Sequence, residues 1–129
     1  MKILIAEDEK MTLKMLSMKL QKDGYQVILA EDGRMAMEYL EKEGCPNMVI
    51  TDIMMPFFSG LEVVEKIRKE LVSKIPIIVL SAMGQEDAVS SAFELGADDY
   101  ITKPFNPNEL SLRVKRLIGL KQSIINTNI

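Results

Sequence analysis

The chain has 129 residues, a formal net charge of −3 and a pI of about 5.1, with 47% hydrophobic and 27% charged residues. This length is enough for one domain with its own hydrophobic core, and the acidic balance argues against non-specific nucleic-acid binding by this chain. The absence of histidine excludes a histidine-based triad, an imidazole metal site and a phosphohistidine relay, and no apolar run approaches the roughly 20 residues that a membrane span needs.

The first part of the chain alternates short apolar runs with a helical pattern. Residues 2–6 are too short and too continuously apolar for an amphipathic helix, so they predict a buried strand. Leu13, Leu16 and Leu20 recur at spacings of three and four, which predicts a helix closed by a Lys-Asp-Gly sequence. Residues 25–30 predict a second strand.

A second helix and a third strand continue this alternation. The pattern over residues 33–43 predicts a helix whose inner face carries Ala36, Tyr39 and Leu40. Residues 48–51 predict a third buried strand, which leads directly to a carboxylate.

The third helix and the fourth strand follow. Ser59 is suited to cap a helix whose inner face would be Leu61, Val64 and Ile67. Residues 75–81 are rich in β-branched side chains and predict the fourth strand.

The last part of the chain contains the clearest helix start. Residues 85–95 predict a helix stopped by a glycine, and residues 99–102 predict a short fifth strand. Asn106 then fits an N-cap, Pro107 the first helical position and Glu109 the third.

Strands that alternate with helices predict parallel crossovers and a sheet covered on both faces. We therefore expect one doubly wound α/β domain over residues 1–120. Residues 121–129 have no helical period and suggest either a frayed end or the start of a linker.

Polar side chains collect after the predicted strands. Glu7 and Asp8 follow the first strand, Asp52 the third, Ser81 ends the fourth and Lys103 follows the fifth. Each has an ordinary explanation by itself, such as a helix cap for Asp8 or a solvated loop lysine for Lys103. Because ligands of open α/β sheets bind outside the carboxyl ends of the strands, their joint occurrence predicts one site.

The residue types of this set indicate its chemistry. Three neighbouring carboxylates repel one another unless a cation intervenes, and oxygen ligands without histidine or cysteine favour Mg²⁺, or Mn²⁺. A lysine and a hydroxyl group suit an added phosphoryl group, and a carboxylate can itself act as the nucleophile.

Four segments resemble the receiver domain of bacterial two-component response regulators: "LIAEDE", "TDIMMPFFSG", "VLSA" and "GADDYITKPFNPNEL". The resemblance covers residues 2 to about 120. It implies a flavodoxin-like fold with a five-stranded parallel sheet in the order 2-1-3-4-5 and about five helices. It also implies a signalling domain, not an enzyme with turnover on an external substrate.

The resemblance implies roles for the acidic residues. Asp52 would be the phosphoacceptor, taking a phosphoryl group from a partner sensor histidine kinase or a phosphotransfer protein. Asp8 and Asp52 would bind Mg²⁺ directly with the backbone carbonyl of Met54, while Glu7 would act mainly through water. Glu7 stands where the family often has Asp.

It also implies a phosphoryl-binding and switch set. Lys103 would hold the acyl phosphate, and Ser81, where Thr is common, would close on it together with the backbone of Ala82. Tyr100 matches the aromatic switch position, and Pro104 matches a proline that is often joined by a cis peptide bond. Phe57 is unusually bulky beside the site and either faces a partner or packs in its loop.

The C-terminal part resembles receivers of winged-helix transcription regulators, which form dimers through the fourth helix, fifth strand and fifth helix. Asp99 and Arg113 match one intersubunit ion pair and Glu109 half of another, whose basic partner is replaced by Val89. A homodimer is thus expected on phosphorylation, with a solvated helix face as the alternative. No DNA-binding module is expected within the chain, so it is either a stand-alone receiver or part of a longer regulator.

Two other classes fit less well. A phosphatase of the haloacid-dehalogenase type needs a second Asp two residues after the nucleophile, where Met54 stands. A flavodoxin-like cofactor binder needs a phosphate loop after the first strand, where the acidic "AEDEK" would repel phosphate.

A single cysteine, Cys45, and an N-terminus unlike a signal peptide predict a cytoplasmic protein without a membrane partner.

Overall fold

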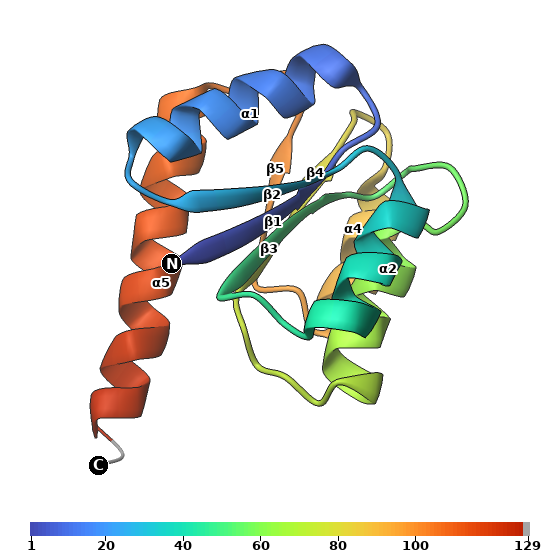
Figure 1. The fold of residues 1–129 in the computed structure, drawn as a ribbon. Coiled ribbons are helices and arrows are strands. Elements are labelled where there is room, and N and C mark those ends of the chain that lie inside the picture. The colour runs from blue at the N-terminus through green and yellow to red at the C-terminus, as the bar shows by residue number, and fades with distance from the viewer. Residues whose placement is uncertain (128–129) are drawn as a thin grey trace.

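The computed structural model describes the backbone of residues 1–127 and the side chains of residues 1–120. Strands and helices alternate along the chain (Figure 1). The strands are β1 (Lys2–Ala6), β2 (Gln26–Ala30), β3 (Met48–Asp52), β4 (Ile77–Ser81) and β5 (Asp99–Thr102). The helices are α1 (Lys10–Lys22), α2 (Gly33–Glu43), α3 (Gly60–Glu65), the π-helical η1 (Lys66–Glu70), α4 (Glu86–Leu95) and α5 (Pro107–Thr127). Within this described part, no helix is long and apolar enough to cross a membrane.

The five strands form one parallel sheet in the order β2-β1-β3-β4-β5, which confirms the doubly wound fold. Helices α1 and α5 cover one face of the sheet, and α2, α3 and α4 cover the other (Figure 1). All strands run in the same direction, so their carboxyl ends lie at one edge of the sheet.

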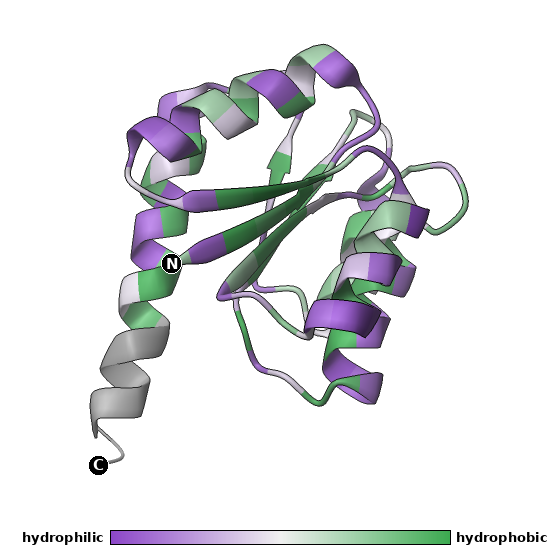
Figure 2. Cartoon of the chain, viewed as in Figure 1, coloured by the Kyte–Doolittle hydropathy of each residue, from purple (hydrophilic) through white to green (hydrophobic). Residues whose placement is uncertain are grey.

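Two hydrophobic layers follow from the alternation of side chains along each strand. In β1, Ile3 and Ile5 pack toward α1 and α5, whereas Leu4 and Ala6 pack toward the opposite helices. Figure 2 shows the strands as hydrophobic along most of their length, while the helices alternate hydrophobic and hydrophilic residues. Each fully buried aliphatic side chain of these layers contributes about 1.5–3 kcal/mol.

Helix caps are formed where the sequence predicts them. The Ser59 hydroxyl accepts a hydrogen bond from the Glu62 N–H at 3.3 Å, and Asn106 Oδ1 accepts one from the Asn108 N–H at 2.8 Å. The inner face of α3 differs from the prediction, because Val63 is fully buried whereas Leu61 is only partly buried.

Strands β2 and β4 are shorter than predicted. The Tyr25 N–H donates to the Leu20 carbonyl and completes the end of α1, so β2 begins one residue later. The Ile75 carbonyl accepts a hydrogen bond from Arg68, and β4 begins at Ile77.

The last helix is longer than the sequence pattern suggests. α5 continues past residue 120 to Thr127, because a helix that has begun gains one hydrogen bond with each added residue and needs no apolar period. Residues 121–127 are therefore helical, and residues 128–129 lie outside the described part. The beginning of a linker here stays a prediction.

Candidate functional site

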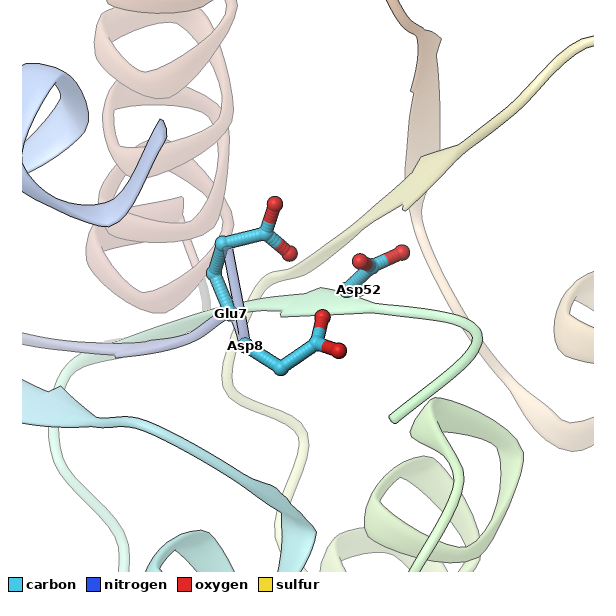
Figure 3. A group of neighbouring side chains, drawn as sticks. All are labelled: Glu7, Asp8 and Asp52. Carbon is cyan, nitrogen blue, oxygen red and sulfur yellow. The ribbon is translucent and has the colours of Figure 1, made fainter. Parts of the chain in front are cut away.

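Three carboxylates face one another at the carboxyl edge of the sheet (Figure 3). Asp52 is the last residue of β3, and Glu7 and Asp8 directly follow the neighbouring strand β1. One oxygen of each carboxylate lies within 4.8 Å of the others. Glu7 is fully buried and Asp52 almost so, whereas Asp8 is exposed. The strand-end residues of distant segments thus meet as predicted.

The alternative role of Asp8 as a helix cap is not what the structure shows. Glu9, not Asp8, is the residue before the first turn of α1, and the Glu9 carboxylate accepts a hydrogen bond from the Thr12 hydroxyl. The Asp8 carboxylate lies instead beside Asp52 and Glu7.

Lys103 joins the acidic cluster from the loop after β5. Its Nζ lies 2.6 Å from Glu7 Oε1 and 2.8 Å from Asp52 Oδ2. The Lys103 N–H donates to the Ser81 carbonyl at 2.7 Å, which ties this loop to the end of β4. The peptide bond from Lys103 to Pro104 is cis, as the resemblance suggested. The ammonium therefore stands between two carboxylates that would otherwise repel each other.

Burial and mutual contacts shift the pKa values of Glu7 and Lys103. Desolvation, together with a hydrogen bond to Asp52, raises the pKa of Glu7 from 4.5 to about 8, although Lys103 acts in the opposite direction. Burial opposes the charge of Lys103, but its hydrogen bonds to Asp52 and Glu7 outweigh burial and raise its pKa. These contacts stabilise the charged form of Lys103, whereas burial favours the protonated form of Glu7.

The donor set fits a hard divalent cation. The clustered ligand atoms are all carboxylate oxygens, which Mg²⁺ and Mn²⁺ prefer. Glu7 Oε2 is buried and, within the described residues, has no hydrogen-bond partner. A buried carboxylate oxygen without a partner is costly, and either a proton or a cation would compensate it.

The switch residues of the prediction lie beside this cluster, around a neighbouring cavity of about 440 Å³. Ser81 is buried at the end of β4, and the Ala82 N–H donates to Gln85 Oε1 at 2.7 Å. Tyr100 is 41% exposed, and its ring meets Phe93 edge to face with centroids 5.8 Å apart. Sequence reasoning missed Gln85 and Phe93. No local pattern predicts that Gln85 turns back to Ala82 or that Phe93 of α4 meets Tyr100 of β5.

The loop after β3 presents exposed apolar side chains. Met54 is 61% exposed and Phe57 is 64% exposed. Phe57 has a positive φ of 73°, which is rare for a bulky residue, and the Arg34 guanidinium lies 4.0 Å from its ring centroid. Phe57 is therefore not buried by its loop, and a cation–π contact holds its ring.

The residues of the expected dimer face pair within one chain. Arg113 Nη1 lies 2.9 Å from Asp99 Oδ1, and Arg113 Nη2 lies 2.9 Å from Glu109 Oε1. Arg113 also donates to the Tyr100 carbonyl and so links α5 to the edge strand β5.

Comparison with known proteins agrees with this fold. Residues 3–115 match the model of the family described as the response regulator receiver domain. A solved structure of a putative response regulator from Chloroflexus aurantiacus has a TM-score of 0.83 and 34% identity, covering 92% of this chain and 97% of that chain.

Two curated relatives are transcriptional regulators by name. The chain is 47% identical over 114 residues to the probable transcriptional regulator ycf27 of Galdieria sulphuraria, covering 88% of this chain and 44% of that protein. It is 39% identical over 117 residues to the alkaline phosphatase synthesis transcriptional regulatory protein PhoP of Bacillus subtilis, covering 91% of this chain and 48% of that protein. The chain thus spans about half the length of these relatives. It belongs to the response regulator receiver domain family of two-component systems.

Proposed function

We propose that the chain is a phosphorylation-dependent signalling switch whose phosphoacceptor is Asp52. The donor would be a phosphohistidine of a sensor histidine kinase or of a phosphotransfer protein. The observation that carries this proposal is the contact of Lys103 Nζ with both Asp52 and Glu7. An ammonium beside a strand-end carboxylate offsets the charge that a phosphoryl group would add.

The transfer is a displacement at phosphorus. An Asp52 carboxylate oxygen forms a bond to phosphorus, the bond between phosphorus and the donor imidazole nitrogen breaks, and its electron pair stays on the imidazole. The product is an acyl phosphate on Asp52. Lys103 would hold it, and the Ser81 hydroxyl and the Ala82 N–H would donate hydrogen bonds to its oxygens.

The acidic cluster would hold the cation that the family uses. Asp8, Asp52 and the Met54 carbonyl would bind Mg²⁺ or Mn²⁺ directly, and Glu7 would act mainly through water. When bound, this cation would offset the negative charge shared by the carboxylates and the phosphoryl oxygens. Support comes from the all-oxygen donor set and from Glu7 Oε2, which has no hydrogen-bond partner among the described residues.

The output would pass through the face made by α4, β5 and α5. Tyr100 belongs to β5 and lines the same cavity as Ser81, so its inward movement would couple Ser81 to this face. The named relatives are transcriptional regulators, so we propose that this face controls a partner, an output domain or a second copy of the chain.

Acetyl phosphate tests the phosphoacceptor directly. Incubation with acetyl phosphate and Mg²⁺ should add one phosphoryl group that is stable in acid and labile in base, as intact-mass measurement would show. Asp52→Asn should abolish the added mass, whereas Asp87→Asn on the exposed surface of α4 should leave it unchanged. Phosphorylation at another residue, or turnover of unrelated phosphate esters, would contradict the proposal.

A further inference from the structure

The Gln85 side chain accepts a hydrogen bond from a backbone N–H just past the carboxyl end of β4. Its Oε1 accepts a hydrogen bond from the Ala82 N–H at 2.7 Å. Gln85 is also the N-cap residue of α4, yet its side chain makes no capping hydrogen bond to that helix. An amide side chain can accept from an N–H only through its oxygen, so this contact fixes how the Gln85 side chain turns back across the β4–α4 loop.

Ala82 directly follows the last residue of β4, at the edge of the sheet that carries Asp52. β3 and β4 pair in parallel with Asp52 opposite Leu80, so Ser81 and Ala82 extend past the level of Asp52 at the same edge. The Ser81 carbonyl is already bonded to the N–H of Lys103, whose ammonium contacts Asp52. The Ala82 N–H belongs to the peptide bond that follows this carbonyl, so it lies at the same edge of the sheet, past the level of Asp52.

A phosphoryl oxygen and Gln85 Oε1 are both acceptors, and one N–H cannot serve both at full strength. The Ala82 N–H is held by Gln85 in the structure. A phosphoryl group that used this donor would therefore have to displace Gln85.

We propose that Gln85 is a latch on the phosphoryl site: it occupies the Ala82 N–H in the unphosphorylated protein, and phosphorylation of Asp52 releases it. This inference rests on the proposed function, because it assumes that the Asp52 phosphoryl group uses the Ala82 N–H. Gln85 precedes the first turn of α4, so its release also removes one contact that ties the start of that helix to the end of β4. The adjoining cavity, which Gln85, Phe93 and Tyr100 help to line, leaves room for this rearrangement.

Beryllofluoride, an analogue of the phosphoryl group, tests the latch in the presence of Mg²⁺. Gln85→Met keeps the length of the side chain but removes its acceptor, so the dissociation constant for beryllofluoride should fall about threefold to tenfold, as the loss of one competing hydrogen bond predicts. Gln85→Glu keeps an acceptor and should bind no more tightly than the unmodified protein. Ser90→Ala, which lines the same cavity, is the matched control and should leave the dissociation constant unchanged.

The outcomes separate the latch from the phosphoacceptor. Equal dissociation constants for the unmodified protein and Gln85→Met would overturn the latch and leave the proposed function in place. Binding that is absent in the unmodified protein, or that survives Asp52→Asn, would overturn the proposed function and the latch with it. Amide exchange measured by NMR gives a second test, since the Ala82 N–H should exchange faster in free Gln85→Met, and unchanged exchange would overturn the latch.

Discussion

The Lys103 ammonium contacts two of the three clustered carboxylates, while the third, Asp8, is exposed. If Glu7 and Asp52 were both ionised, one lysine would leave a net negative charge in a nearly buried site. A proton on Glu7 removes that excess, which agrees with the raised pKa of Glu7. The same excess of negative charge favours binding of a divalent cation, since a cation can replace the proton on Glu7.

Glu7 should therefore make stability depend on pH when no divalent cation is present. Its pKa is raised from 4.5 to about 8 by burial first and then by Asp52, so above pH 4.5 the folded protein holds a proton that the unfolded chain releases. The free energy of unfolding should fall as pH rises through this window, by at most about 1.4 kcal/mol per pH unit. Lys103 does not oppose this fall, because its raised pKa acts only at much higher pH.

Urea unfolding in a chelator at about pH 5 and about pH 8 would measure this fall. Glu7→Gln mimics the protonated side chain and should remove most of the slope. Glu94→Gln, at an exposed position of α4, should keep it. A slope that persists in Glu7→Gln would assign the pH dependence to another group.

At the scale of elements, local sequence patterns predicted the strands and helices that local contacts determine. The alternation of apolar runs with helical periods predicted every strand and the principal helices, and Asn106 marked the start of α5. The π-helical η1 and the late start of β4 were not predictable in this way. Both lie around Arg68, whose guanidinium donates to the carbonyls of Ser73, Ile75 and Gly96. These are contacts between segments, and periodicity carries no information about them.

The same distinction holds for the site. Glu7, Asp52 and Lys103 were predictable as one group because parallel strands bring their carboxyl ends to one edge. The strand order itself came from family resemblance. The contact of Gln85 with Ala82 depends on the path of one loop, and it became visible only in the structure.

Gly60 tests how tightly α3 fixes the end of β3. A Cβ atom at this position would lie 2.2 Å from the Asp52 carbonyl oxygen and 2.9 Å from Ile53 Cα, both backbone atoms. Gly60→Ala should therefore lower the free energy of unfolding by about 2–3 kcal/mol. It should also slow phosphorylation by acetyl phosphate, because the backbone that carries Asp52 must move.

Gly119 supplies the matched control on α5, where an added Cβ meets no heavy atom within 4 Å. Gly119→Ala should raise the free energy of unfolding by about 0.5–1 kcal/mol, since alanine favours a helix interior. Urea unfolding of the two variants measures the contrast. Equal stabilities would contradict the close packing of α3 on the end of β3.

At the scale of the whole molecule, side chains of the face made by α4, β5 and α5 bind one another within the chain. Arg113 binds Asp99 and Glu109 of its own chain and also covers the Tyr100 carbonyl at the edge strand. The Tyr100 ring rests against Phe93 on the same face. An intersubunit ion pair between Arg113 and Asp99 would have to replace the pair that they form within the chain. Such an exchange adds little to the free energy of dimerisation unless the face first rearranges.

The proposed homodimer should for this reason depend on the phosphoryl state. Sedimentation velocity should show a monomer without beryllofluoride and a concentration-dependent shift toward a dimer with beryllofluoride and Mg²⁺. Arg113→Glu should remove this shift, because it places a third negative charge beside Asp99 and Glu109. Lys14→Glu, an equal change of charge on the exposed side of α1, should keep it. A monomer at high concentration with beryllofluoride bound would rule out the dimer while leaving Asp52 as the phosphoacceptor, and the output would then pass through a different partner on this face.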